Sequence, residues 1–373
     1  MDNNRPIKLA IGLMSGTSLD GIDAALITSD GDTVQRFGQA FHMDYSTDMR
    51  SRLKQALSEA RKEKRPTDKN ALINETEQIQ TDLHYVVVCE LLELNGLKTD
   101  DIDVIGFHGQ TLLHGPDEGW TWQIGLGERL AKRLNITVVN DLRGNDVKNG
   151  GQGAPMVPVY HQSILKGQIS EYPAALINIG GVANITWVGS EEGGDMVAFD
   201  TGPGNALLDD WVREHTDLPY DIDGMISIKG KVNDDMVSGW MENDYFDISP
   251  PKSLDRDDFE VSEVSALSLE DGAATLCAFT AATIKAGAAK CPAEVKNWYV
   301  CGGGAHNPVI MKMLKDVLDG DVAPINALGF DGDYIEAEAF AYMAVRKLYD
   351  LPITFPGTTG ISEPSTGGVI NLP

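Results

Sequence analysis

Cysteine is scarce in this sequence, and long apolar runs are absent. The chain has four cysteines in 373 residues, and no two of them have CxxC spacing. Cysteines so few and so scattered exclude a disulfide framework and indicate a reducing compartment, so we expect a cytoplasmic protein. No apolar run reaches the length of a transmembrane helix, and the first residues lack the apolar region of a signal peptide.

Basic side chains are also few for a chain of this length. Thirty Lys and Arg stand against 56 Asp and Glu, which gives a formal net charge of −26. This charge repels nucleic acid and anionic membranes, so we expect neither as a partner. It also opposes an anionic ligand such as ATP, so a phosphate site must use local backbone donors, helix N-termini or a metal cation.

The length and the order of elements indicate a two-domain α/β protein. The chain exceeds the size at which one hydrophobic core usually keeps growing. Short strands alternate with predicted helices at about 71–94, 127–134 and 269–289. We expect an N-terminal lobe over 1–140, to which residues 360–373 are a candidate to return, and a C-terminal lobe over 141–359.

Three glycine-rich turns follow apolar strands. A predicted hairpin over 9–28 has Ser15 to Gly21 at its tip, a second hairpin turns at Gly180-Gly181, and a later strand passes through Gly302 to Gly304 into a helix. One such turn is usually only a tight connection, because glycine tolerates positive φ. Three in this order favour a nucleotide site, in which two tips hold phosphates and the third turn covers the nucleoside.

The predicted nucleotide contacts are the residues of these three turns: Gly16, Thr17, Ser18, Leu19, Asp20, Gly21, Ile22, Asp23, Gly180, Gly181, Gly302, Gly303 and Gly304. The two aspartates could hold Mg²⁺ through water. They could equally be local, Asp20 as a turn residue and Asp23 as a strand-edge carboxylate. The metal ligands therefore stay unassigned.

Six motifs, in order and spacing, carry a family resemblance: GLMSGTSLDGIDAAL, GFHGQTLLHGP, NDLRGNDVKNGGQGAPMVP, INIGGVANIT, FDTGPGNALLD and CGGGAHNPVIMKML. Together with the C-terminal TTGISEPSTGGVINLP they resemble the anhydro-N-acetylmuramic acid kinase family over essentially the whole chain. The resemblance implies a two-lobed actin-like ATPase (ribonuclease H-like) fold with an active-site cleft between the domains. It also implies a homodimer.

The resemblance further implies one unusual reaction, in peptidoglycan recycling. ATP, water and 1,6-anhydro-N-acetylmuramic acid give ADP and N-acetylmuramic acid 6-phosphate, with Mg²⁺ and ATP as the cofactors. Water attacks the anomeric carbon, the 1,6-anhydro bridge opens, and the released oxygen at carbon 6 takes the γ-phosphoryl group. Two bonds therefore change in one site.

Two carboxylates are the candidate catalytic groups. The motif match assigns Asp200, in AFDTGPGN, as the general base that deprotonates the water. The alternative is that Asp200 only caps a helix that begins near Gly204. Glu336 matches a second carboxylate of the family, although in a helix beside Glu338 it could equally be a solvated charge of the first turn.

Sugar recognition is expected from Thr111, Arg143 and Asp146. The guanidinium fork of Arg143 suits the lactyl carboxylate of a muramic sugar, and the carboxylate of Asp146 could accept sugar hydroxyl protons. An exposed ion pair is the alternative for these two residues. Thr111 follows a strand and is a candidate sugar contact, whereas His108 is expected to be mainly structural.

The sequence departs from the expected patterns at two places. Leu13-Met14 precedes the first glycine turn where the wider superfamily usually has an Asp, so metal placement cannot be copied from hexokinase. In the loop Pro250 to Phe259, Leu254-Asp255 replaces an expected Thr-Gly, and we expect this loop to be peripheral to the chemistry. The alternative functions are an Hsp70-like ATPase, for which no peptide-binding domain follows, and a kinase for an ordinary sugar hydroxyl.

Overall fold

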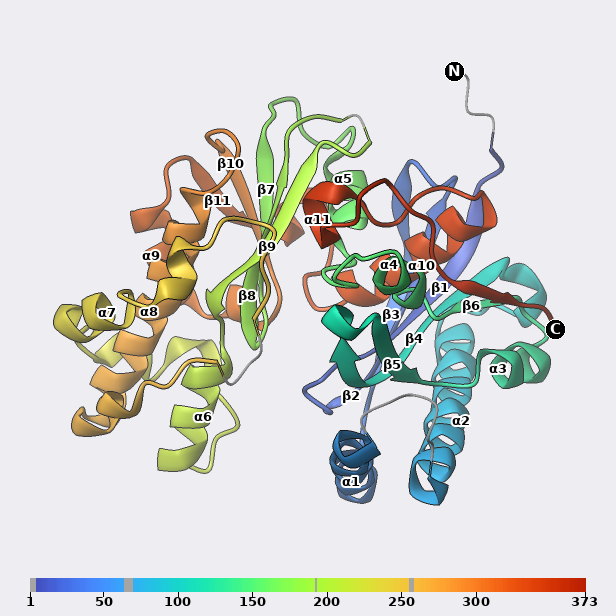
Figure 1. Cartoon of the computed structure of the whole chain (residues 1–373), viewed down its shortest axis with the longest axis horizontal. Helices are drawn as coiled ribbons and strands as arrows, with labels where there is room; N and C mark the ends of the chain where they lie inside the picture. The colour runs from blue at the N-terminus through green and yellow to red at the C-terminus, as the bar shows by residue number, and fades with distance from the viewer. Residues whose placement is uncertain (1–4, 64–69, 192, 255–257) are drawn as a thin grey trace. The chain divides into compact units, whose positions relative to one another are not determined.

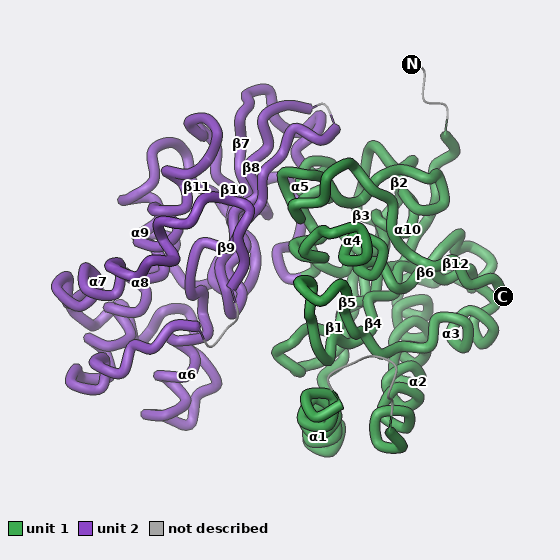
Figure 2. Tube along the Cα trace, viewed as in Figure 1, with its two compact units in different colours: residues 1–164, 334–373 green, residues 165–333 purple. Residues whose placement is uncertain are grey.

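The computed structural model describes residues 5–63, 70–191, 193–254 and 258–373, which form two compact units (Figures 1 and 2). Unit 1 comprises residues 1–164 and 334–373, and unit 2 comprises residues 165–333. The units differ from the expected lobes, because residues 141–164 and 334–359 belong to unit 1. Helix α10 (Ile335–Leu348) is the reason for the second difference, since it packs on the strands of unit 1.

The sheet of unit 1 is built around the predicted hairpin. Strands β1 (Lys8–Ser15), β2 (Gly21–Ser29) and β3 (Val34–Asp44) are antiparallel neighbours. On the other side of β1 lie β4 (Val104–Gly115) and then β6 (Val138–Asn140), both parallel. The sheet is completed by β5 (Trp120–Ile124) on β4 and β12 (Val369–Asn371) on β6. The C-terminal segment thus pairs within unit 1.

Helices cover the two faces of this sheet. A Cβ atom on Gly12 would lie 1.7 Å from the Ala337 carbonyl oxygen, and one on Gly106 would lie 1.9 Å from that of Phe340, so only glycine lets α10 approach this closely. The alternate residues of the same strands, among them Leu13 and Phe107, pack with α2 (Ala71–Leu94). The remaining helices of unit 1 are α1 (Thr47–Glu63), α3 (Gly127–Leu134), α4 (Gly144–Lys148), α5 (Pro158–Leu165) and α11 (Pro356–Thr359).

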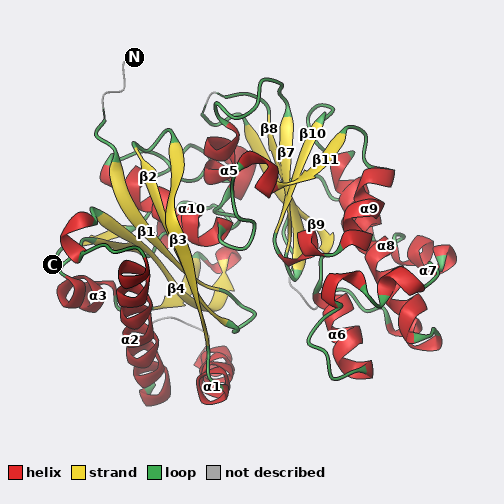
Figure 3. Cartoon of the chain, turned by 180° about the vertical axis from the view of Figure 1, so that it is seen from behind, coloured by secondary structure: helices red, strands yellow, loops and turns green. Residues whose placement is uncertain are grey.

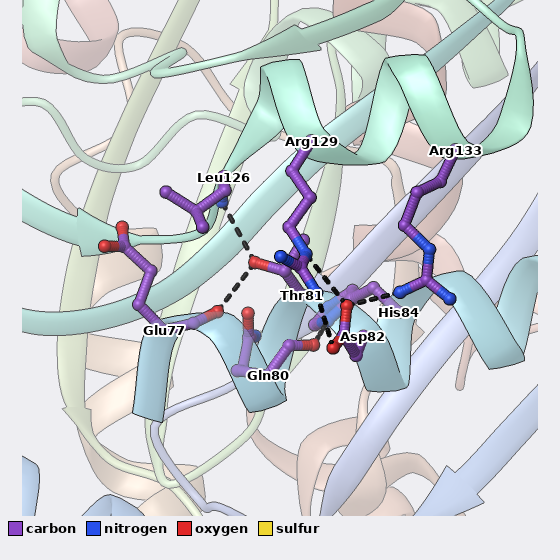
Figure 4. A network of polar contacts seen from close by, with 8 residues as sticks. All are labelled: Glu77, Gln80, Thr81, Asp82, His84, Leu126, Arg129 and Arg133. Carbon is purple, nitrogen blue, oxygen red and sulfur yellow. Dashed lines mark hydrogen bonds and ion pairs between the residues drawn. The ribbon is translucent and has the colours of Figure 1, made fainter. Parts of the chain in front are cut away.

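Polar side chains of α2 join it to α3 and its preceding loop (Figure 4). Thr81 Oγ1 accepts the Leu126 N–H at 3.0 Å, and Glu77 Oε1 accepts the Gly125 N–H at 3.0 Å. Asp82 pairs with Arg129 and Arg133 on the exposed side. The buried polar residues of α2 therefore satisfy backbone donors at the start of α3, where a helix has no carbonyls of its own to offer.

Unit 2 repeats the same strand order. Strands β7 (Ala174–Ile179), β8 (Val182–Val188) and β9 (Met196–Pro203) are antiparallel, while β10 (Asn297–Cys301) and β11 (Asp321–Pro324) continue parallel from β7. The helices of unit 2 are α6 (Ala206–His215), α7 (Asp234–Trp240), α8 (Leu269–Ala288) and α9 (Pro308–Val317) (Figure 3). This repeated order, three antiparallel strands followed by two parallel ones, confirms the predicted ribonuclease H-like α/β fold.

None of the helices in the described ranges combines the length and the apolar character that crossing a bilayer would need.

Candidate active site

The tip of the first hairpin turns its donors outward. Between β1 and β2, Thr17 and Ser18 are exposed, whereas the Leu19 side chain is buried with its backbone in the left-handed region at φ 55°. The N–H groups of Thr17 and Ser18 meet no acceptor in the part of the chain that the structure describes. Two main-chain donors and the Thr17 hydroxyl are therefore left to a ligand at this tip, which suits a phosphate group.

The two aspartates of this hairpin have local partners. Asp20 Oδ1 accepts the Ser18 hydroxyl at 2.8 Å and the Gly21 N–H at 2.9 Å, while Asp23 Oδ1 lies 2.6 Å from His42 Nδ1. Among residues 5–63, 70–191, 193–254 and 258–373 there is no group of three or more His, Cys, Asp or Glu that could hold a metal ion. The described residues of the hairpin thus form no metal cage by themselves.

The tip of the second hairpin is fixed through its carbonyl groups. The Gly180 and Gly181 oxygens accept the N–H groups of Asn205 at 2.7 Å and Gly204 at 2.9 Å. A Cβ atom on Gly204 would lie 2.2 Å from the Gly180 oxygen, so the turn after β9 requires glycine for this contact. Within the described ranges no acceptor takes the N–H groups of Gly180 or Gly181, so this tip also offers main-chain donors.

A pocket of ≈ 490 Å³ lies in unit 2 beside the third glycine turn. Gly302 has φ 76°, and a short 3-10 turn over Gly303–His306 leads from it to α9. Of the three predicted glycines, Gly303 lines the pocket. The other lining residues are Asn205, Leu208, Asp209, Tyr220, Asp221, Ile222, Asp223, His306, Asn307 and Asp333. They come from distant segments, so no local sequence signal could have found them.

Asp200 lies on β9 and is held by a segment far along the chain. Its N–H donates to the Lys252 carbonyl at 3.0 Å, and its own carbonyl accepts the Tyr245 hydroxyl at 2.7 Å. The side-chain Oδ2 accepts the Leu254 N–H at 2.9 Å. Helix α6 begins only at Ala206, so Asp200 is not its cap. The Asp200 carboxylate is half-buried, and the segment that carries Leu254 orients it.

The expectation that the 250–259 loop is peripheral is wrong, because this loop positions Asp200. Lys252 lies over the Tyr245 ring, with Nζ 3.9 Å from the ring centroid, and donates to the Tyr245 carbonyl at 2.9 Å. Burial, and then the charge of Lys290, lower the pKa of Lys252 to about 8, although Asp200 and Asp247 act in the opposite direction. Residues 255–257, which include part of the departure from the family pattern, lie outside the described residues.

Arg143 precedes α4 in unit 1, and its guanidinium group donates two hydrogen bonds to the described residues. Its Nε donates to His108 Nε2 at 3.2 Å, and Nη1 donates to the Gly153 carbonyl at 2.8 Å. Burial, with the neighbouring charge of Arg143, lowers the pKa of His108 well below its ordinary value. A neutral His108 accepts from Arg143 and so orients the guanidinium group. Nη2 donates to none of the described residues.

The other two predicted sugar contacts are bonded to protein groups. Asp146 is 1% exposed, and its oxygens accept the Gly153 N–H and the Thr359 hydroxyl, both at 2.7 Å. It is therefore not an exposed ion pair, and this geometry fixes the loop that carries Arg143. Thr111 accepts from Gln123 Nε2 at 3.2 Å. Gln123 and His108 line a second pocket, of ≈ 270 Å³, in unit 1.

Glu336 and Glu338 have separate surroundings. Glu338 is fully buried and accepts Arg36 Nε at 2.6 Å and the Tyr160 hydroxyl at 2.7 Å. Glu336, in the first turn of α10, is exposed. Desolvation by neighbouring protein atoms raises its pKa, while the charge of Arg143 lowers it and those of Asp23 and Asp20 raise it further. The charges of Arg143 and of the first hairpin therefore both act on Glu336.

The chain is similar to a known protein family along nearly its whole length. The anhydro-N-acetylmuramic acid kinase family model matches residues 8–373. The anhydro-N-acetylmuramic acid kinase of Rhizorhabdus wittichii is 50% identical over 98% of this chain and 99% of its own, and that of Paramagnetospirillum magneticum is 47% identical over 98% and 100%. A solved structure, the activator of the 2-hydroxyisocaproyl-CoA dehydratase from Clostridium difficile with bound ADPNP, is 13% identical over 91% of this chain and 96% of its own, with a TM-score of 0.49. On the family match and these identities, the chain belongs to the anhydro-N-acetylmuramic acid kinase family.

Proposed function

We propose that the chain is an ATP-dependent kinase that hydrolytically opens 1,6-anhydro-N-acetylmuramic acid and phosphorylates O6. The products are N-acetylmuramic acid 6-phosphate and ADP, which places the enzyme in cell-wall recycling in the cytoplasm. Family membership along nearly the whole chain is the observation that carries this proposal. The orientation of the Asp200 carboxylate adds a physical argument for the chemistry.

Asp200 takes a proton from the attacking water. The water oxygen forms a bond with the anomeric carbon, and the bond between that carbon and the bridging oxygen breaks. The bridging oxygen, which stays bonded to carbon 6, attacks the γ-phosphorus, and the bond between the γ-phosphorus and the β,γ-bridging oxygen breaks to release ADP. Three hydrogen bonds hold Asp200 at its N–H, its carbonyl and its carboxylate, so the base is preorganised for this step. Glu336 supplies the second carboxylate that orients the water.

The outward donors of the two hairpin tips fit the phosphates of ATP. Thr17 and Ser18 offer main-chain N–H groups, Thr17 also offers its hydroxyl, and Gly180 and Gly181 offer main-chain N–H groups. Four aspartates line the ≈ 490 Å³ pocket beside Gly303, so it suits the uncharged base and the ribose hydroxyls rather than phosphates. Mg²⁺, when bound, neutralises phosphate charge. Asp20 and Asp23 fit a water-mediated contact with the ion better than direct ligation, since both carboxylates have local partners.

Arg143 and Thr111 are the proposed contacts to the sugar. The two contacts of Arg143 leave Nη2 to a ligand, and a carboxylate such as the lactyl group is the natural acceptor for a guanidinium fork. Asp146 holds the loop behind Arg143 and is within reach of the sugar only if Thr359 releases it. Its contact with the sugar stays a prediction.

Mass spectrometry of the sugar tests the proposed reaction. The purified protein is incubated with Mg-ATP and 1,6-anhydro-N-acetylmuramic acid, and we expect the sugar to gain one phosphoryl group and one water. A phosphoryl group without water would indicate a kinase for an ordinary hydroxyl. ATP hydrolysis with an unchanged sugar would indicate the ATPase alternative and contradict the proposal.

Activity should decrease at alkaline pH, because it depends on the positive charge of Lys252. Its lowered pKa, about 8, means that the ammonium group is charged below that pH and loses its proton above it. The ammonium group donates to the Tyr245 carbonyl and lies over the Tyr245 ring, and Tyr245 in turn holds the Asp200 carbonyl. Both Lys252 contacts weaken when the positive charge is lost, so kcat/KM should fall by roughly threefold to tenfold above pH 8. Lys252→Arg should shift this alkaline limb of the pH profile of kcat/KM to higher pH, because arginine stays protonated. Lys252→Met should remove the limb and lower activity at all pH values. An alkaline limb that is unchanged in both variants would contradict this role.

A further inference from the structure

We infer that Gln110 is a positioning residue that holds the first hairpin in its donor-outward form, with Tyr45 as a second support. The inference rests on the proposed function, in which this hairpin binds phosphate. Gln110 lies on β4, which is the parallel neighbour of β1, and Ser15 pairs with it in the sheet register. Its side chain is fully buried, so it cannot contact the nucleotide itself.

The amide of Gln110 bonds to both residues at the start of the hairpin tip. Nε2 donates to the Gly16 carbonyl at 3.1 Å, and Oε1 accepts the Ser15 hydroxyl at 2.6 Å. The carbonyls of Gly16 and Thr111 can only accept, so the nitrogen of the amide must face them. The opposite amide orientation would place two oxygens against each other. The network therefore fixes which end of the amide faces Ser15.

This assignment sets the direction of every proton in the network. Ser15 has one hydroxyl proton, which goes to Gln110 Oε1, so the Tyr45 hydroxyl, 2.8 Å from Ser15 Oγ, must donate to Ser15. Burial, as the main cause, raises the pKa of Tyr45 to about 12, and this keeps the hydroxyl a neutral donor. The chain of donors runs from Tyr45 through Ser15 to Gln110.

Gln110 and Tyr45 hold the two ends of the tip. The Tyr45 N–H donates to the Asp20 carbonyl at 2.8 Å, at the far end, and the Gly16 carbonyl that Gln110 holds also accepts the Leu19 N–H at 3.3 Å. Bonds to carbonyls on the inner side turn the intervening N–H groups of Thr17 and Ser18 to the outer side. Loss of Gln110 should thus leave the fold in place but let the peptide planes of the tip rotate.

The test compares Gln110→Leu and Tyr45→Phe with a matched control. The control, Tyr342→Phe, removes a buried tyrosine hydroxyl from the same unit, but this hydroxyl donates to the Gly31 carbonyl at the other end of β2. We expect Gln110→Leu to raise KM for ATP about tenfold and Tyr45→Phe to raise it about threefold. KM for the sugar should change less than about twofold in either variant. Tyr342→Phe should leave both KM values unchanged, although it should lower Tm by as much as the two test variants or by more.

Amide hydrogen exchange gives a readout that does not depend on activity. Exchange at Leu19 and Tyr45, whose N–H groups bond to carbonyls of the tip, should become faster in Gln110→Leu, with β1 and α2 unchanged. If the wild type converts no sugar, the proposed function fails, but the exchange result still decides whether Gln110 holds the tip. Unchanged exchange at the tip, or equal increases in KM for ATP and for the sugar, would overturn the inference. If Gln110→Leu does not fold, Tyr45→Phe decides by the same two measurements.

Discussion

Asp200→Asn is expected to lower kcat by about a thousandfold, because an amide cannot take a proton from the attacking water. The amide oxygen can still accept the Leu254 N–H that Asp200 Oδ2 accepts now, so the orientation of the side chain should survive. ATP affinity should change by less than about twofold, since the donors of both hairpin tips are untouched. Turnover by mass spectrometry and nucleotide binding by calorimetry measure the two effects separately.

A matched carboxylate in the same unit controls for the loss of charge. Asp210→Asn removes an exposed carboxylate on α6 that pairs with Arg213 three residues along the helix, and it should leave kcat within about twofold. Tyr245→Phe is the complementary variant, because it removes a hydrogen bond to the Asp200 carbonyl but keeps the carboxylate. We expect an intermediate loss. An Asp200→Asn variant with more than a tenth of normal turnover would show that Asp200 is not the base.

The sequence predicted the local elements of the site well. The hairpins around Ser15 to Gly21 and Gly180-Gly181 were predictable, because apolar runs on both sides of a glycine turn determine such a hairpin from neighbouring residues alone. The helices at 71–94 and 127–134 also have the predicted bounds. In each case the signal and the element lie in the same short stretch of chain.

Contacts between distant segments were beyond the reach of the sequence. No local pattern relates Leu254 to Asp200, so the sequence alone indicates a peripheral loop there. Asp146 illustrates the same limit, because its residue type suits a sugar contact, yet Thr359 and Gly153 occupy its oxygens. Side-chain chemistry indicates what a residue can bind, whereas the packing of other segments decides which partner it has.

The return of the chain from unit 2 to unit 1 at residue 334 is hidden in the sequence for a related reason. Residues 334–359 come after the third glycine turn, α9 and β11 in the chain, so the order of the sequence places them with unit 2. The glycines that receive α10, Gly12 and Gly106, lie more than two hundred residues earlier and look like ordinary strand residues. Their need for a missing Cβ becomes visible only once the helix lies on the strands.

Arg143→Lys is expected to weaken sugar binding by roughly tenfold to a hundredfold, with little effect on ATP. Lysine keeps the positive charge but has no planar fork. It cannot donate to His108 Nε2 and to the Gly153 carbonyl while still presenting a donor to a ligand in the direction of Nη2. The loss should therefore appear as a higher KM for the sugar, with kcat changed less than KM.

A second sugar shows whether Arg143 reads the lactyl carboxylate. 1,6-Anhydro-N-acetylglucosamine has the same anhydro bridge without the lactyl group, so it lacks the acceptor that we assign to Arg143. In the wild type, kcat/KM should favour the muramic sugar, and Arg143→Lys should reduce that preference by lowering kcat/KM for the muramic sugar alone. An equal loss for both sugars would mean that Arg143 supports the loop rather than the ligand.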